Sequence, residues 1–374
     1  MEFDLSAALA AMQSGAAFRV ANEARPGSDY VFNSLLPEEQ RFDYQAKAGS
    51  MTVRSTMAGL VGMDSPYPET GSIELSAFSE ETTKIANRVR MPEKSLRDLH
   101  EFIRHVRDGG GNVSQAIQLE AINFLDKLIV QSHLDTMEYL RGQALVTGGI
   151  DWIFNKIRLK VDYGVPTNHF LPQRTGANGY GGNTSMFWSD IRSLKKLLRN
   201  DVRAFILHSN TKEMILANEA NNITLLSEDI DRGTFSIVRR IKTLAGVDSL
   251  SMQSTDPRDR AQFITYDAEG ELYDPTDPSR TIQIPFMAEG AILAVGNYNA
   301  RRYVVGQGAT APTVYNLGYT HLAPTIEGKG RPGRWADVFT PEREPWAVEG
   351  RGVTNGLPVI EAPDRIAVAS TEMS

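Results

Sequence analysis

The chain has 374 residues, 46 of them acidic and 39 basic, which gives a formal net charge of −7. This excess of acid disfavours tight binding to nucleic-acid phosphates but is compatible with loose enclosure of a nucleic acid. The absence of cysteine excludes disulfides, thiolate metal sites and a cysteine nucleophile. No apolar run reaches the ~18 to 20 residues of a membrane span. Because residues 1–13 also lack the basic segment of a signal peptide, we expect a soluble, unexported protein.

The first 45 residues are expected to form an N-terminal arm. A short helix is predicted at 5–12, but Arg25, Pro26 and Gly27 interrupt any longer element. No periodic apolar face follows between residues 14 and 45. Such a segment cannot bury a core of its own, so we expect it to become ordered by contact with partners.

Residues 46–86 alternate apolar and polar side chains on both sides of a tip rich in glycine and proline. This alternation predicts two strands and therefore a long hairpin. Its apolar content is too thin for a core, so we expect another molecule to cover it. The candidate contact residues are the apolar members of the two strands: Met51, Val53, Met57, Ile73, Leu75 and Phe78.

Residues 92–148 are predicted to be strongly helical. Pro92 suits a first helical turn, and an apolar face runs from Leu96 to Val106 before three glycines end that helix. Neither glycine nor proline occurs from residue 114 to residue 141, and we expect one helix over 114–146. At the usual rise per residue such a helix is ~40 Å long, which exceeds the usual length in a globular domain.

The rest of the chain mixes helices and strands. We expect strands at 157–163, 261–266, 281–285, 291–295 and 365–369, helices at 189–199, 212–218 and 235–244, and a turn at 268–271. Asn210 stands three residues before Glu213, which fits a capping box for the helix at 212–218.

Basic residues gather in two places. The first cluster lies on one predicted helix and comprises Arg192, Lys195, Lys196 and Arg199; the second comprises Arg239, Arg240 and Lys242. A solvated helix face is the simplest interpretation of such clusters. No aromatic residues that could stack on bases are interleaved with them. We therefore favour salt bridges to another subunit over nucleic-acid binding, and we take the first cluster as a further set of candidate contacts.

The sequence shows no convincing catalytic or metal-binding pattern. Residues 328–333 match G-x-G-x-x-G, but Pro332 and the lack of a strand–turn–helix context argue against a dinucleotide site. The six histidines lack metal-ligand spacing, and no G-x-S-x-G nucleophile elbow occurs. We therefore expect no catalytic residue, no bound metal and no cofactor, and a protein that is not an enzyme.

Three segments, 115–163, 284–297 and 356–368, resemble the major capsid proteins of tailed phages, which share the Hong Kong ninety-seven fold. Within that group the chain looks most like the lambda-type family, often called major capsid protein E. The resemblance implies an α+β fold with an N-terminal arm, an extended hairpin loop, a peripheral domain with a long spine helix, and an axial domain. It assigns 1–45 to the arm, 46–86 to the hairpin, 87–184 to the peripheral domain with its spine helix at 114–146, 185–325 to the axial domain, and 326–374 to a return to the peripheral domain.

The resemblance also implies a function. A chain of this kind would be a structural subunit that assembles as hexamers and pentamers into an icosahedral shell around double-stranded DNA, with arm and hairpin locking neighbours together. Its expected partners are other copies of itself, a decoration protein, a scaffold and a portal, with no membrane. Assembly in the host cytoplasm and a final location in the virion follow. The alternatives are an encapsulin-type cage, another virion structural protein, or an α/β hydrolase, which would need converging polar residues.

Overall fold

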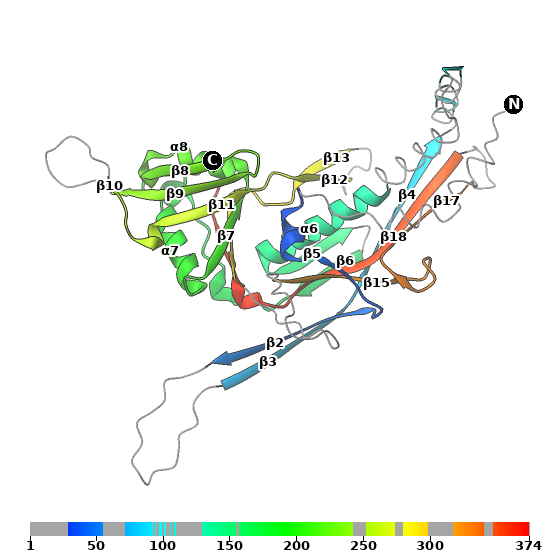
Figure 1. The fold of residues 1–374 in the computed structure, drawn as a ribbon, viewed down its shortest axis with the longest axis horizontal. Helices are drawn as coiled ribbons and strands as arrows, with labels where there is room; N and C mark the ends of the chain where they lie inside the picture. Colours follow the sequence, from blue (N-terminus) through cyan, green and yellow to red (C-terminus); the bar gives the residue numbers. More distant parts are fainter. Residues whose placement is uncertain are drawn as a thin grey trace, which may run out of the picture.

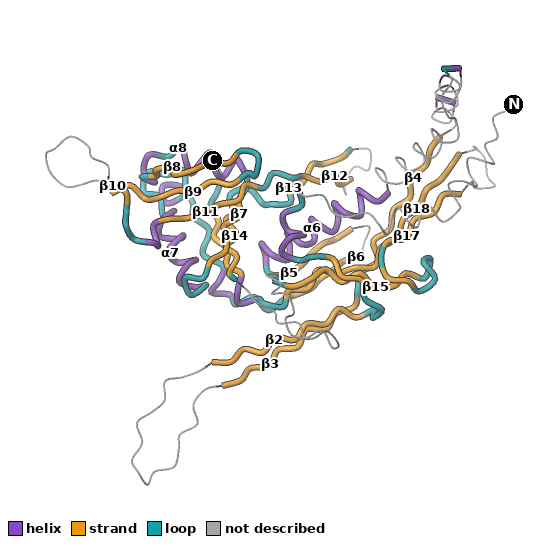
Figure 2. Tube along the Cα trace, viewed as in Figure 1, coloured by secondary structure: helices purple, strands orange, loops and turns teal. Residues whose placement is uncertain are grey.

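The computed structural model describes residues 29–54, 72–92, 129–154, 157–241, 252–273, 280–297, 317–339 and 347–373, with a few more between 94 and 109. Within these residues, two β-sheets form the body with a helix between them, and a two-stranded hairpin extends away from the body (Figure 1 and Figure 2). This mixture confirms the expected α+β class. The helix expected at 5–12 and the hairpin tip lie outside the described residues.

The first sheet is organised around one long strand, β18. On one side β18 pairs antiparallel with β4, and on the other it pairs first with β17 and then with β15. Strand β15 also pairs with β1 and β16. The bounds are β1 (Glu38–Gln40), β4 (Thr83–Pro92), β15 (Gly318–Thr325), β16 (Arg331–Pro332), β17 (Arg334–Phe339) and β18 (Ala347–Ile360).

Strand β4 corrects one sequence prediction. Pro92 does not begin a helix, because it is the last residue of β4 and pairs with Ala347. A period-two signal is present in this stretch: Ile85, Asn87 and Val89 are partly buried, while the residues between them are exposed. Asn87 breaks the apolar run, and proline at a strand end is compatible with a sheet, so local pattern alone was ambiguous.

Helix α6 (Gln131–Thr147) is the described part of the helix expected at 114–146. Residues 111–128 lie outside the described residues, so the expected full length stays a prediction. Buried residues occupy most of the circumference of α6. The reason is that α6 contacts β18 of the first sheet as well as strands of the second sheet. This helix therefore couples the two sheets.

Two glycines shape the surroundings of α6. An added Cβ at Gly142 would lie 2.4 Å from the carbonyl oxygen of Phe286, so glycine allows that backbone to approach the helix closely. Gly148 ends the helix with a φ of 73°, the left-handed cap that glycine favours. Strands β5 (Gly149–Phe154) and β6 (Ile157–Asp162) follow as an antiparallel pair.

The second sheet has the order β8–β9–β11–β7–β14–β19, and β10 also pairs with β9. Its bounds are β7 (Val202–Leu207), β8 (Ile223–Asp229), β9 (Thr234–Ile241), β10 (Met252–Gln253), β11 (Arg260–Thr265), β14 (Ala291–Gly296) and β19 (Ile366–Ser370). Helices α7 (Phe187–Leu197) and α8 (Ser209–Ala217) accompany it. An aromatic core joins α7 to the sheet: Phe263 stacks on Phe235 with ring centroids 4.9 Å apart and also lies against Phe187 and Phe205.

Three further sequence predictions are wrong here. The helix expected at 235–244 is wrong, because residues 234–241 form strand β9. The spacing of its apolar residues fits the period of a helix as well as that of a strand, and pairing with β8 and β11 selects the strand. The turn expected at 268–271 contains the start of β12 (Glu269–Tyr273), which pairs with β13 (Thr281–Pro285). Helix α8 begins earlier than expected, and His208, not Asn210, accepts the capping hydrogen bond.

Sheet membership does not follow chain order. Strand β15 lies in the first sheet with β18. The later strand β19 pairs with β14 in the second sheet. Long-range pairing decides both assignments, and nothing in the local pattern records it.

A buried charged cluster ties the N-terminal residues to the first sheet and to α6. Arg141 of α6 is fully buried, and its guanidinium donates to Glu138 Oε2 at 3.0 Å, to Glu38 Oε1 at 3.0 Å and to Thr320 Oγ1 at 2.8 Å. Arg334 of β17 contacts the same Glu38 oxygen. The cluster therefore joins a helix and three strands through two carboxylates.

The second oxygen of Glu138 extends this cluster. Glu138 Oε1 accepts from the backbone N–H of Phe32 and from the hydroxyl of Tyr266, each at 2.8 Å. Burial, followed by the neighbouring carboxylate, raises the pKa of Tyr266, so the phenol stays a donor. Removing one partner of a buried ion pair generally costs about 3–5 kcal/mol, because the remaining charge is left uncompensated. The cluster consequently fixes residues 30–41 within the subunit. The expectation that partners order the whole of 1–45 is therefore wrong for this part, because Phe32, Leu35 and Leu36 are buried in the subunit's own core.

His133 provides a test of the packing between α6 and β18. Its Nε2 lies 2.9 Å from Asn87 Oδ1, and burial, aided by the charge of Arg334, lowers its pKa to about 3. The folded state therefore keeps His133 neutral, whereas the unfolded chain takes up a proton below about pH 6.5. The contribution of His133 to the free energy of unfolding is therefore fully present above about pH 6.5, and it is lost progressively as the pH falls towards 3.

We expect H133Q to reduce the loss of unfolding free energy between pH 7.5 and pH 5.5 by about 1.3 kcal/mol. Glutamine keeps a donor for Asn87 but does not titrate. Denaturant unfolding of parent and variant at both pH values measures the difference. The control is H105Q, because His105 is exposed. Equal pH dependence in the parent and H133Q would contradict the assignment.

Candidate functional site

The first candidate surface is the hairpin formed by β2 (Gln45–Arg54) and β3 (Ser72–Glu81). All ten residues of each strand pair antiparallel, from Gln45 opposite Glu81 to Arg54 opposite Ser72. Figure 1 shows the hairpin extending away from both sheets. Among the described residues the two strands pair only with each other, so their outer edges are unpaired. Unpaired strand edges are sites where another chain can add a strand.

The register groups the predicted hairpin contacts. Met51 lies opposite Leu75, and Val53 lies opposite Ile73. Because successive residues of a strand point to opposite faces, these four residues share one face of the hairpin. Phe78, opposite Ala48, has the other parity and belongs to the opposite face. Met57 lies outside the described residues.

Exposed aromatic residues at the base of the hairpin were missed by the sequence reasoning. Phe42 is 77% exposed and Tyr44 is 49% exposed. They alternate with polar residues just before β2, and that pattern was visible in the sequence. An aromatic ring left this exposed beside unpaired strands adds to the apolar surface that a neighbouring molecule could cover.

The second candidate surface is the basic cluster of α7, which the structure divides. Arg192 donates to Asp259 at 2.8 Å. Lys195 donates to backbone carbonyls of 257–260, including Pro257 at 3.1 Å. Both cations therefore form their bonds within the subunit. Lys196 and Arg199 are exposed, and Arg199 follows the helix with a φ of 56°.

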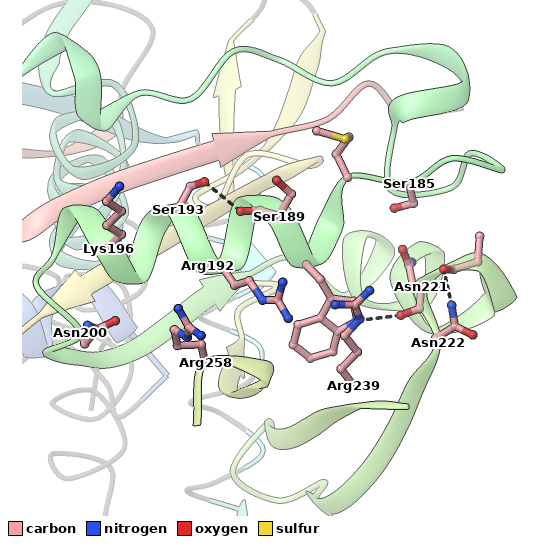
Figure 3. Close-up of a pocket in the computed structure, with 13 residues that line it drawn as sticks. Ser185, Ser189, Arg192, Ser193, Lys196, Asn200, Asn221, Asn222, Arg239 and Arg258 are labelled. Carbon is pink, nitrogen blue, oxygen red and sulfur yellow. Dashed lines mark hydrogen bonds between the residues drawn. The ribbon is translucent and has the colours of Figure 1, made fainter. Parts of the chain in front are cut away.

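A groove of about 590 Å³ beside α7 brings the two basic clusters together. Its cationic lining residues are Arg192, Lys196, Arg239 and Arg258, and its lining includes no carboxylate. Figure 3 shows the side chains of Arg192, Arg239 and Arg258 extending into the same space beside the helix. The sequence pointed to each cluster separately, but not to their convergence or to Arg258. We call this site the basic groove.

Polar and apolar groups complete the basic groove. Serine hydroxyls line it along α7, asparagine amides line it near β8, and Met186 and Trp188 contribute apolar surface. The indole N–H of Trp188 donates to the backbone oxygen of Asn221 at 2.6 Å, which fixes the ring. Side-chain hydrogen bonds from Arg258 lower the pKa of the flanking Asp256 to about 2. Asp256 therefore stays ionised at neutral pH and pairs with Arg258 at the edge of the groove.

The described residues hold no cluster of three histidine or carboxylate groups that could bind a metal ion. The helices among them are too short or too polar to span a bilayer. What the described surfaces offer is unpaired strand edges, exposed aromatic rings and a cationic groove, all suited to contacts with other macromolecules.

No family model matches the sequence, and no curated protein matches it. Among solved structures, a protein described as a prophage capsid protein of Escherichia coli CFT073 aligns with a TM-score of 0.55 at 8% identity, covering 96% of this chain and 99% of that chain. This chain has the fold of a phage capsid protein. The expected Hong Kong ninety-seven fold is thereby confirmed, and the alignment extends over nearly the whole chain.

Two weaker likenesses accompany this match. A phage-related protein of Bordetella bronchiseptica RB50 aligns with a TM-score of 0.48 at 10% identity, over 96% of each chain. The SrpI encapsulin of Synechococcus elongatus PCC 7942 aligns with a TM-score of 0.40 at 10% identity, over 95% of this chain and 94% of that chain. At such identities a capsid fold does not by itself fix a function.

Adjacent lysines of α7 offer a matched test of which cations hold the subunit itself. Burial lowers the pKa of Lys195, and the charges of Asp259 and Asp256 partly offset that effect. Its ammonium group also donates to backbone oxygens of the same chain. We expect K195M to lower the free energy of unfolding by about 1–2 kcal/mol, because those carbonyls lose a charged donor. K196M should change it by less than about 0.5 kcal/mol, as exposed sites usually do. Denaturant unfolding measures both, and equal effects would contradict the division of roles.

Proposed function

We propose that this chain is the structural subunit of an icosahedral phage head. Copies would assemble as hexamers and pentamers into a shell around double-stranded DNA. The observation that carries the proposal is the β2–β3 hairpin, whose strands pair only with each other among the described residues, in a chain with a capsid fold. A subunit that tiles a closed shell needs such segments, because its stability is completed by its neighbours.

The contact residues of this proposal come from both candidate surfaces. On the hairpin, Met51, Val53, Ile73 and Leu75 would form the face that packs on a neighbour, with Phe78 on the other face and Met57 beyond the paired strands. On α7, Lys196 and Arg199 would serve contacts, since Arg192 and Lys195 bond within the subunit. Exposed Phe42 would extend the hairpin surface.

The finer parts of the proposal follow the resemblance to the lambda-type family. We place the arm at 1–45, the hairpin at 46–86 and the peripheral and axial domains around the two sheets. A decoration protein, a scaffold and a portal would be the other partners. Assembly would take place in the host cytoplasm, and the role would need no catalytic centre. The net charge of −7 would keep enclosed DNA from adhering to the wall.

A shortened hairpin tests the proposal. Residues 52–74 are replaced by Asn-Gly, which closes a two-residue hairpin between the paired Met51 and Leu75. We expect a subunit that folds with the parent's thermal midpoint and does not form shells, because the described residues of the removed segment, 52–54 and 72–74, lie outside both sheets. Electron microscopy and sedimentation velocity measure assembly, and calorimetry measures folding.

The matched control shortens a different hairpin. Replacing residues 274–280 by Asn-Gly joins Tyr273 to its partner Thr281 and should leave assembly intact. Shells formed by the 52–74 variant would refute the role of the hairpin. A parent chain that stays monomeric would refute the capsid function itself. Shells that package protein in place of DNA during expression in the host would favour an encapsulin-type cage.

A further inference from the structure

The basic groove carries positive charge that its own chain does not neutralise. Arg192 pairs with Asp259, and Arg258 pairs with Asp256. Lys196 and Arg239 enter none of the ion pairs found among the described residues, although both line the groove. At about 590 Å³ the groove has room for on the order of twenty water molecules. Its size and charge suit an anionic segment of chain better than a single small ion.

An anionic segment of fitting chemistry lies at the turn between β8 and β9. We call residues 228–231, Glu228 to Asp231, the acidic turn; all four are exposed. Ile230 at its centre is 86% exposed, with Asp229 and Asp231 on either side. Asp231 forms no ion pair among the described residues. The turn thus presents an apolar side chain between two carboxylates, which matches apolar Met186 and Trp188 surrounded by cations in the groove.

The acidic turn cannot reach the basic groove of its own subunit. The groove includes Asn222 and Arg239, which lie where β8 begins and β9 nears its end. The acidic turn lies at the opposite end of the same strand pair. Five residues of β8, 223–227, separate Asn222 from Glu228. Six steps of about 3.3 Å along the strand hold these two residues roughly 20 Å apart. The occupant must therefore come from another molecule.

We propose that the acidic turn of one copy docks in the basic groove of a second copy. Ile230 would lie against Met186 at the mouth of the groove, since Trp188 beneath it is buried. Asp231 would approach Arg239, and Asp229, which pairs with Arg232 of its own chain, would lie beside Lys196. The inference deepens the proposed function, since it rests on many copies of the chain meeting in one shell. A contact between two different patches is heterologous, so it can propagate around a ring or across a lattice.

The test is a charge swap within one chain. R239E and D231R each place like charges in the contact, and neither residue has an ion-pair partner within the described subunit, so both variants should fold. Because each full-length chain carries both patches, the double variant R239E/D231R restores an opposite pair with reversed polarity. The control K160E reverses an exposed lysine on β6, away from both sites.

Assembly of the purified full chain is followed by sedimentation velocity over a concentration series. We expect each single variant to raise the concentration needed for assembly about tenfold or more, equivalent to about 1.4 kcal/mol per contact. The double variant should return to within about threefold of the parent, and K160E should match the parent. Circular dichroism checks that each variant is folded.

Other outcomes overturn the inference. If the parent and both single variants assemble alike, the contact does not exist, although the capsid function stands. If the double variant is as impaired as the two single variants combined, the residues do not meet. If R239E loses binding to a double-stranded DNA probe while D231R assembles normally, the groove holds nucleic acid instead. A parent that never assembles overturns both the inference and the proposed function.

Discussion

The rest of the structure depends on a fully buried arginine, Arg141, held between the carboxylates of Glu138 and Glu38. A charge taken out of water is costly unless opposite charges and hydrogen bonds surround it. The groups that bind Arg141 come from α6, from residues 30–41 and from the first sheet. Tyr266, which directly follows β11 of the second sheet, donates to Glu138 and so joins that sheet to the cluster. Satisfying one guanidinium therefore requires distant parts of the sequence to arrive together.

Much of the fold was readable from local pattern, and the errors have physical reasons. The hairpin, the described part of α6, and strands β6, β11, β13 and β14 were predicted because each alternates or repeats clearly. Strand β9 was mistaken for a helix because its apolar residues suit both periods. Which sheet β15 and β19 join was not predictable from local pattern. The paired residues of β15 and β18 are 32 to 42 positions apart and those of β14 and β19 are 71 to 79 positions apart, and such pairing leaves no local trace. Sequence pattern reports which face is buried, but not what buries it.

The candidate site was predictable only in pieces. Both basic clusters were visible in the sequence as groups of arginine and lysine. The apolar hairpin residues were visible through the alternation of apolar and polar side chains. What remained hidden was the use of each charge: Lys195 and Lys196 are neighbours, yet one bonds its own backbone and the other faces solvent. Adjacent residues of a helix point in directions about 100° apart. The sequence does not show that residues 256–260 lie beside α7, so it could not tell which of the two lysines contacts its own chain. The convergence of Arg239 with α7 needed the pairing of β9.

The position of β19 has a mechanical consequence. The chain connects the two sheets three times. After α6 and the β5–β6 pair it enters the second sheet at β7, and after β14 it re-enters the first sheet at β15. Residues 361–365 then lead from β18 to β19, which ends in the second sheet. The two sheets are thus joined by three covalent links in parallel, not by one linker in series. A force applied to one sheet is shared among these links and the packed helix between them. Cutting any single link would leave the two halves still tethered.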